Sequence, residues 1–504
     1  MRADTLRYFD YAATTPADPR VMEAMFGCLG ADGVFGNPAS TSHAVGLTAK
    51  DLVEQARAQV ADLIGAEPCE IVWTSGATES NNLALKGFFD NEPGRRQLIT
   101  SQLEHKAILD TAAHLKRLNV SVTYLAPDRS GEISVAAVKA ACGHDTGLVS
   151  LMMVNNEIGT LTNIAEISRV VHAAGALLHV DAAQAAGKTA IDVKAMGIDL
   201  LSMSAHKLYG PKGVGALYVS REAAPRIACQ MHGGGHEQGL RSGTLATHQI
   251  VGMGTACELA RMQMASDNQR IAQLSERLLS GVCASGAVTQ NVANAKRIPH
   301  TLSLTVDLPD FFPSMLADGL AASSTSACNS AAGKASHVLT CIGLDEGAAQ
   351  RTVRLSLGRF TTEEDVDFAI DCFQKAIARC QGVINVREER AENQINHLSN
   401  DVSVAAQLSA ADVQTAHALG FRSIVCNRHD EEDAGQPRFA EIAEVADSLG
   451  MPAHYLPVKS GSVTAEDATA FRLLLTELPK PVLIYCRTGT RSATLWSLAE
   501  IRRD

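Results

Sequence analysis

The chain has 504 residues, of which 46% are hydrophobic and 20% charged, and its formal net charge is −11. A chain of this length exceeds one ordinary hydrophobic core, so at least two domains are expected. The acidic balance, without a long basic cluster, argues against nucleic acid as the main partner. No apolar run approaches the roughly 20 residues that span a bilayer, so no membrane partner is expected either.

The twelve cysteines include no Cys-x-x-Cys pair. Their scatter argues against a structural zinc site and against a disulfide scaffold, so we predict no metal site. The N-terminus, residues 1–5, lacks the basic-then-apolar pattern of a secretion signal. We therefore expect free thiols in a reducing cytoplasm, most of them buried as packing residues.

Short apolar runs alternate with amphipathic stretches from about residue 60 to about residue 220. This alternation predicts an α/β fold with a mostly parallel sheet, helices on both faces, and ligands at the carboxyl ends of the strands. A helix at 164–174 and a long helix at 250–265 are expected, and a smaller α/β region then runs to about residue 382. The expected strands are 71–73, 97–100, 122–125, 148–153, 177–180, 199–203 and 214–219.

A charged stretch without a hydrophobic stripe follows at 386–394, which predicts a linker over 385–395. Beyond it the alternation restarts, and roughly 110 residues can form an independent domain. We expect helices at 409–419, 438–449 and 465–475 and strands at 423–426, 454–458 and 482–485. The predicted domains are 1–384 and 396–504. The first comprises a large domain of about 15–255 and a small domain made from the N-terminal segment plus about 256–384.

Two neighbouring apolar runs of the first domain end in residues with distinctive chemistry. Asp181 ends one run, with Gln184 just beyond, and Lys207 follows the next. A lysine that forms a Schiff base and a carboxylate that keeps a pyridine nitrogen protonated are what pyridoxal phosphate requires. Taken alone, Lys207 could equally be a surface lysine.

Three more strand ends carry polar groups. Residues 74–82 open a helix, whose N-terminus suits a phosphate but would also fit an ordinary capped helix. His105 could stack on a cofactor ring and move protons, or be a structural histidine. Asn156 could act at the site or in a turn.

Together these segments resemble the cysteine desulfurases, members of the class V aminotransferase group with the fold-type-I pyridoxal phosphate architecture. The resemblance covers about residues 5–382 and rests on many matches in order rather than on one motif. The matching segments are 10–16, 36–40, 74–82, 104–106, 154–159, 179–184, 204–207, 232–244 and 354–360.

The resemblance implies a role for each residue. Lys207 would be the Schiff-base lysine, with Asp181 on the pyridine nitrogen, Gln184 on the phenolic oxygen and His105 stacked on the ring. Arg354 would clamp the substrate carboxylate in a bidentate fork. The assisting residues would be Asn37 and Asn156 for the substrate and Ala77, Thr78, Ser204 and His206 for the phosphate. Thr244 would reach the phosphate of the neighbouring subunit, which implies a homodimer.

Cys328 lies in a segment rich in small polar residues, 323–334, which favours an exposed loop over a core position. The resemblance identifies Cys328 as the nucleophile that takes sulfur from L-cysteine, leaving L-alanine and a persulfide. Thr325 stands where many relatives have glycine, a departure that could stiffen the loop without removing the thiol.

The C-terminal domain has a reactive-cysteine loop of its own between a strand and a helix, at 485–492. Four residues separate Cys486 from Arg491, and inward-pointing amides, a helix N-terminus and an arginine favour a thiolate. Tyrosine phosphatases use five intervening residues, whereas this spacing resembles the rhodaneses, which carry sulfur as a persulfide. The domain as a whole resembles the phosphatase-like sulfurtransferase family found beside β-lactamase-like hydrolases.

The expected function is therefore a cysteine desulfurase whose sulfur passes from Cys328 to Cys486 and on to an acceptor. An iron–sulfur scaffold and a tRNA thiolation enzyme both fit as acceptors. A selenocysteine lyase or related pyridoxal phosphate enzyme stays open as an alternative, with a C-terminal phosphatase or inert interaction module. A non-catalytic scaffold is disfavoured by the presence together of Lys207, Asp181, His105, Cys328 and Arg354.

Overall fold

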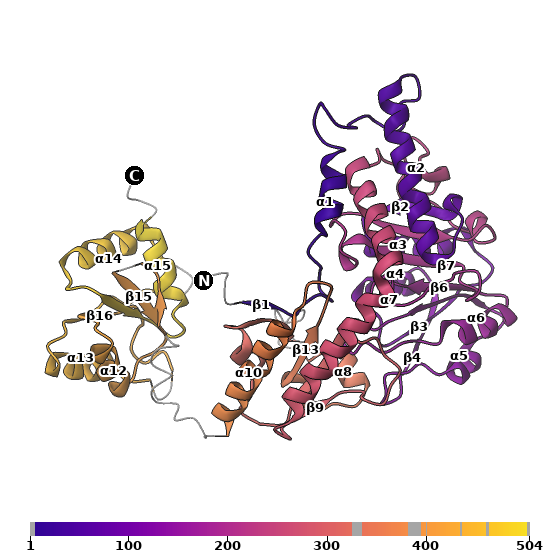
Figure 1. Ribbon diagram of the computed structural model, residues 1–504. Coiled ribbons are helices and arrows are strands. Elements are labelled where there is room, and N and C mark those ends of the chain that lie inside the picture. Colours follow the sequence, from indigo (N-terminus) through magenta and orange to yellow (C-terminus); the bar gives the residue numbers. More distant parts are fainter. Residues whose placement is uncertain are drawn as a thin grey trace. The chain divides into compact units, whose positions relative to one another are not determined.

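The chain forms two compact units, Met1–Cys380 and Gln381–Asp504, each described by itself (Figure 1). The computed structural model describes residues 6–324, 335–381, 395–399, 401–433, 436–459 and 463–500. Of the linker predicted at 385–395, all but Ile395 lies outside the described residues.

A seven-stranded sheet forms the centre of the first unit, in the order β2-β8-β7-β6-β5-β3-β4. Only β8 runs against its neighbours, so the other strands share one direction and one carboxyl edge. The strands are β2 (Ile71–Thr74), β3 (Gln97–Ser101), β4 (Ser121–Leu125), β5 (Thr146–Met152), β6 (Leu177–Asp181), β7 (Leu200–Ser204) and β8 (Gly215–Val219).

Helices cover both faces of this sheet (Figure 1). Two separate apolar clusters fill the spaces between helices and strands, because a mostly parallel sheet is apolar on both sides. One face is covered by α3 (Ala77–Asn91) and α4 (Lys106–Arg117). The other is covered by α2 (Ala44–Ile64), α5 (Val135–Ala141), α6 (Ile164–Ala173) and the first half of α7 (Thr247–Cys283). The predicted fold class is confirmed.

Helix α7 is 37 residues long, much longer than the helix predicted at 250–265. Its first half packs in the large core through residues such as Ile250 and Met253, and its second half packs in a different core through Ile271 and Leu278. The predicted end at residue 265 was too early because polar residues lie between the two halves. One helix therefore spans the large and small domains.

The small domain has a four-stranded antiparallel sheet in the order β12-β13-β10-β9. Strand β1 pairs in parallel with β11 beside it, so the N-terminal segment belongs to this part of the unit. The strands are β1 (Arg7–Tyr8), β9 (Val288–Gln290), β10 (Thr301–Val306), β11 (Leu320–Ala321), β12 (Ser323–Ser324) and β13 (Thr352–Ser356). The remaining helices of the unit are α1 (Pro19–Phe26), α8 (His337–Cys341), α9 (Glu346–Gln350) and α10 (Glu363–Cys380).

The second unit is a smaller α/β layer structure. Its sheet has the order β14-β15-β18-β16-β17 and is parallel except for β14. Helices α12 and α13 pack in one core, and α14 and α15 pack in another. The elements are β14 (Asn396–His397), β15 (Val402–Ala405), α12 (Ala410–Ala418), β16 (Ser423–Cys426), α13 (Phe439–Ser448), β17 (Ala453–Tyr455), α14 (Ala465–Glu477), β18 (Val482–Tyr485) and α15 (Thr490–Glu500).

No helix in the described ranges combines the length and the apolar character that crossing a bilayer requires. No group of three His, Cys, Asp or Glu side chains comes together there as metal ligands would.

Candidate active site

Lys207 ends a short 3-10 turn directly after β7, at the carboxyl edge of the large sheet. Its Nζ donates hydrogen bonds to the carbonyl oxygens of Ala12 and Ala13, at 2.6 and 2.7 Å. Both alanines follow strand β1, so the N-terminal segment reaches across to the sheet edge. The lysine amine is therefore held in place at this edge.

A cavity of about 640 Å³ opens beside the lysine amine. Its walls come from the carboxyl ends of the parallel strands, from the N-terminal segment and from β12 and β13, as expected for an α/β sheet. Ten residues predicted from the sequence line it: Ala77, Thr78, His105, Asn156, Asp181, Gln184, Ser204, His206, Lys207 and Arg354.

The N-terminus of α3 forms a cradle at one side of the cavity. Its N-cap is Gly76, which offers no side-chain acceptor to the first turn, so those N–H groups remain for a ligand. Gly76 has a φ of +149°, and a Cβ there would come within 3.6 Å of the Ser204 hydroxyl. A small anion such as a phosphate fits these donors, with Thr78 and His206 nearby in the wall.

Asp181 ends β6 and is almost fully buried. One carboxylate oxygen accepts from the Asn81 amide at 2.8 Å, and the other accepts from the Ala183 backbone N–H at 3.0 Å. Asn81 lies inside the predicted helix-opening segment, but the sequence reading gave it no role. Through its hydrogen bond, Asn81 orients the carboxylate that would face a cofactor nitrogen. The amide oxygen of Asn81 is itself buried without a partner in the described structure.

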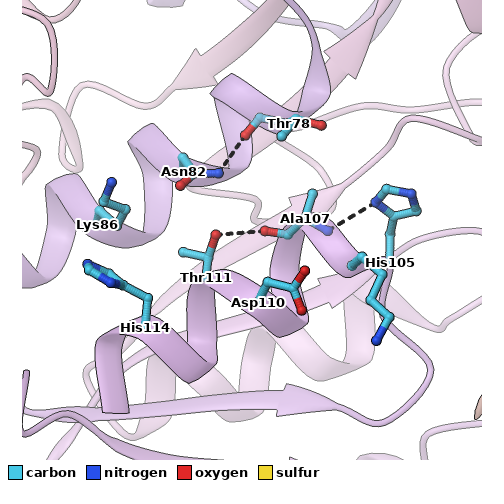
Figure 2. Close-up of a pocket in the computed structure, with 9 residues that line it drawn as sticks. Thr78, Asn82, Lys86, His105, Ala107, Asp110, Thr111 and His114 are labelled. Carbon is cyan, nitrogen blue, oxygen red and sulfur yellow. Dashed lines mark hydrogen bonds between the residues drawn. The ribbon is translucent and has the colours of Figure 1, made fainter. Parts of the chain in front are cut away.

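His105 is the N-cap of α4, and its Nδ1 accepts the backbone N–H of Ala107 at 3.1 Å (Figure 2). Because Nδ1 is an acceptor, Nε2 is the atom that can exchange a proton with a ligand. Burial lowers the pKa of His105, with an opposing contribution from Asp181 and a further lowering from Lys207. The imidazole is therefore favoured in its neutral form.

A second cavity, of about 540 Å³, lies along α3 and α4 and shares Thr78, His105 and Ala107 with the first. Figure 2 shows Lys86 and His114 at one end of this cavity and His105 at the other. The space around His105 therefore continues into a groove between the two helices.

Arg354 on β13 is buried and held by three protein acceptors. Its Nη2 donates to Asp10 at 2.7 Å and to the Ser323 hydroxyl at 2.8 Å, and its Nη1 donates to the Asn156 carbonyl at 3.0 Å. Its Nε has no partner in the described residues. The guanidinium thus has a donor left for a carboxylate, and Asp10, which the sequence reading did not single out, is its counter-ion.

Two residues predicted for this site, Asn37 and Thr244, do not line this cavity. Asn37 is exposed and caps its own turn by accepting the N–H of Ala39 at 3.0 Å. Thr244 is exposed and lines neither cavity. Cys328 lies outside the described residues.

The second unit places its reactive-cysteine loop at the carboxyl end of β18, where α15 begins. Cys486 is 1% exposed. Arg491 donates from both terminal nitrogens to Glu432, at 2.8 and 3.0 Å, and this pairing lowers the pKa of Glu432 to about 2. Arg428 also donates to Glu432, at 3.1 Å. The loop arginine is therefore already engaged by a carboxylate, a feature that the spacing of Cys486 and Arg491 did not reveal.

Residues 7–368 match the family model for aminotransferase class-V, and the chain belongs to that family. Within it the chain belongs with the cysteine desulfurases. It is 51% identical over 384 residues to cysteine desulfurase IscS of Azotobacter vinelandii, covering 76% of this chain and 93% of the relative. It is also 51% identical over 373 residues to cysteine desulfurase IscS of Pseudomonas entomophila, covering 73% and 92%.

Solved structures agree with this assignment for the first unit, and a second family model matches the second unit. A NifS-like protein is 34% identical with a TM-score of 0.68, covering 74% of this chain and 100% of that one. The structure of SspA in complex with cysteine is 40% identical with a TM-score of 0.64, covering 71% and 100%. Residues 394–502 match the phosphatase-like domain of beta-lactamase hydrolase-like protein. The resemblances expected from the sequence are confirmed for both units.

Proposed function

We propose that this chain is a pyridoxal-phosphate-dependent cysteine desulfurase that converts L-cysteine to L-alanine. The observation that supports it best is one cavity bordered by Lys207, Asp181, Arg354 and the α3 N-terminus. An amine, a buried carboxylate, a guanidinium and an anion cradle are the groups that hold this cofactor and an amino acid. The buried, unpartnered oxygen of Asn81 behind Asp181 fits a site prepared for a polar ring.

Bound pyridoxal phosphate supplies an aldehyde and an electron-accepting ring. Lys207 would anchor that aldehyde, and its amine would be the base for the Cα proton of the substrate. Asp181 would hold the ring nitrogen, Gln184 would hold the phenolic oxygen, and the first turn of α3 with Ser204 and His206 would hold the phosphate. Arg354 binds the substrate carboxylate beside Asn156. Nε2 of His105 exchanges a proton with the substrate thiol.

Sulfur leaves the substrate by attack of the Cys328 thiolate on the substrate sulfur. The new bond joins the two sulfur atoms, and the broken bond is the one between the substrate sulfur and its Cβ. The electron pair of that bond stays with carbon, which becomes the methyl group of alanine after protonation. The product on the protein is a persulfide.

The test is an absorbance band of bound cofactor together with alanine formed from cysteine. Lys207→Ala should lose both the covalent cofactor band and the activity. Arg354→Gln should keep the band and raise KM for cysteine by at least about tenfold. Selenocysteine as competing substrate tests the alternative, since a lyase would turn it over and leave cysteine unreacted.

A homodimer is proposed from the surface of the first unit. Large apolar side chains are exposed on α1, the following loop and the start of α2, namely Met22, Phe26, Leu29, Phe35, Val45 and Leu47. A patch of this kind marks an interface. A second copy seated there would bring its own Thr244 to the phosphate cradle.

Phe26→Asp should yield monomers by sedimentation, and Thr244→Ala should weaken cofactor binding within an intact dimer.

Sulfur relay to Cys486 is the proposed role of the second unit, and it requires the sheltered thiol to become reachable. Cysteine with radioactive sulfur should label both Cys328 and Cys486, and Cys328→Ser should abolish label at Cys486. Cys426→Ser, which alters another buried cysteine of the second unit, is the matched control and should leave the label unchanged. Equal labelling of Cys486 in Cys328→Ser and in the wild type would contradict the relay.

The acceptor beyond Cys486 is proposed to be an iron–sulfur scaffold or a tRNA thiolation enzyme. A cytoplasmic location stays a prediction.

A further inference from the structure

Lys188 is a buried amine with no part in the chemistry above. It is 7% exposed, and its Nζ donates to Oε1 of Gln184 at 2.7 Å. No carboxylate of the described residues lies within ion-pair distance of it. Lysine side chains are almost never fully buried unless they are paired with an opposite charge, so the burial of Lys188 requires an explanation.

The backbone fixes this amine under Gln184. Tight turns run through the segment: the Ala186 N–H donates to the Ala182 carbonyl, and the N–H groups of Lys188 and Thr189 both donate to the Ala185 carbonyl. Gly187 has a φ of +73°, and the chain turns there so that the Lys188 amine meets the Gln184 amide. The Lys188 carbonyl accepts from the Asn268 amide of α7 at 2.9 Å.

The groups around Lys188 are mostly cationic or neutral. Burial, with contributions from Lys207 and Arg354, lowers the pKa of Lys188 to about 7. His300 is buried nearby, and the charge of Lys188 contributes to the lowering of its pKa. In either protonation state the Lys188 amine has an N–H to give to Gln184.

The amide of Gln184 has a second fixed contact at its other end. Its Nε2 donates to the Ala12 carbonyl at 2.8 Å, and Lys207 donates to the same carbonyl at 2.6 Å. If the amide were reversed, its oxygen would face the Ala12 carbonyl and its nitrogen would face the Lys188 amine. The contact with the Ala12 carbonyl would then be unfavourable in every case, and the contact with Lys188 would be unfavourable whenever the amine is protonated.

We propose that Lys188 is a positioning residue: it fixes the Gln184 amide so that the second N–H of Nε2 is kept for the phenolic oxygen of pyridoxal phosphate. This inference rests on the proposed function. Since one Nε2 hydrogen is used by Ala12, the orientation set by Lys188 decides whether the cofactor meets a donor or an acceptor.

The arrangement predicts opposite effects on cofactor binding and on stability. An isolated buried ammonium costs desolvation energy that no ion pair offsets. Methionine fills a similar volume without that cost. Lys188→Met should therefore weaken cofactor binding while leaving the cofactor-free chain at least as stable, whereas a merely structural lysine would lower both.

The experiment titrates the full-length, cofactor-free protein with pyridoxal phosphate and follows the absorbance of the bound form. Lys188→Met should raise the dissociation constant about tenfold, as expected for a misplaced hydrogen bond. Gln184→Leu should raise it similarly, and the double variant should match Gln184→Leu within about twofold. Lys194→Met is the control, since that half-exposed lysine pairs with Glu70, and its dissociation constant should equal that of the wild type.

Three results would overturn the proposal: wild-type affinity in Lys188→Met, additive effects in the double variant, or a fall in the thermal midpoint of cofactor-free Lys188→Met. Failure of the wild-type chain itself to bind pyridoxal phosphate is a different outcome, and it would overturn the proposed function.

Discussion

The carboxyl of Glu104 is buried at the carboxyl end of β3, one residue before His105. Its Oε1 accepts from the Ser101 hydroxyl at 2.6 Å and from the Met152 N–H at 3.1 Å, while Oε2 has no partner in the described structure. Burial raises the pKa of Glu104 to about 8, and these hydrogen bonds oppose the shift only in part. The folded unit therefore keeps this carboxyl neutral at pH 7.

A neutral buried carboxyl makes the stability of the first unit depend on pH. The unfolded chain loses the proton near pH 4.5, whereas the folded chain keeps it to about pH 8. Between these values the folded state binds one more proton, so its stability falls as pH rises, by at most about 1.4 kcal/mol per pH unit.

Glu104→Gln replaces the titrating carboxyl with a neutral amide. It should therefore raise the thermal midpoint at pH 8 while leaving it nearly unchanged at pH 4.5. The comparison is made by thermal melts of both proteins across this range. Glu276→Gln, an exposed glutamate of α7, is the control and should show no such trend. Parallel pH curves for Glu104→Gln and the wild type would contradict the prediction.

At the scale of elements, the sequence located the site because parallel strands bring their carboxyl ends to one edge. Strand-end motifs far apart in the chain, such as those of Asp181 and Lys207, were predicted to meet, and both line one cavity. Partners that act through the fold were not predictable. Asp10 meets Arg354 only through pairing of the N-terminal segment with β13.

Predictions from local sequence patterns also failed where tertiary packing determines the presence or the bounds of an element. Strand β15 was not predicted. It has only four residues, all of them buried, and it lies in the interior of the second sheet. Strand β17 ends at Tyr455, earlier than the predicted residue 458, and Pro457 two residues later cannot donate to a ladder. Helix α7 extends beyond the predicted end at residue 265 because its second half packs in the core of the small domain.

The start of α3 gives a prediction at this scale. Gly76→Ala places a side chain at a φ of +149°, where L-residues are strained, although the space beside Ser204 is open. The first turn should shift to relieve this strain, and the pyridoxal phosphate dissociation constant should rise about tenfold. Gly143→Ala, an exposed glycine without contacts, should bind as the wild type does. Equal affinities for both variants would show that the cradle tolerates a side chain.

At the scale of the whole molecule, each unit has apolar clusters built from its own described residues. Three clusters draw only on residues of the first unit and two only on residues of the second. Each unit also has complete sheets of its own. A unit with its own hydrophobic core and its own sheets can fold alone.

Separate expression of residues 1–384 and 385–504 tests this independence. The first fragment should form alanine from cysteine within about twofold of the full-length rate, because every described residue of the cavity lies in it. The second should unfold cooperatively in denaturant, because its two cores are complete. The full-length chain with Cys486→Ser is the control that separates loss of the unit from loss of its thiol. A first fragment that is folded yet inactive would mean that the second unit takes part in the conversion of cysteine itself.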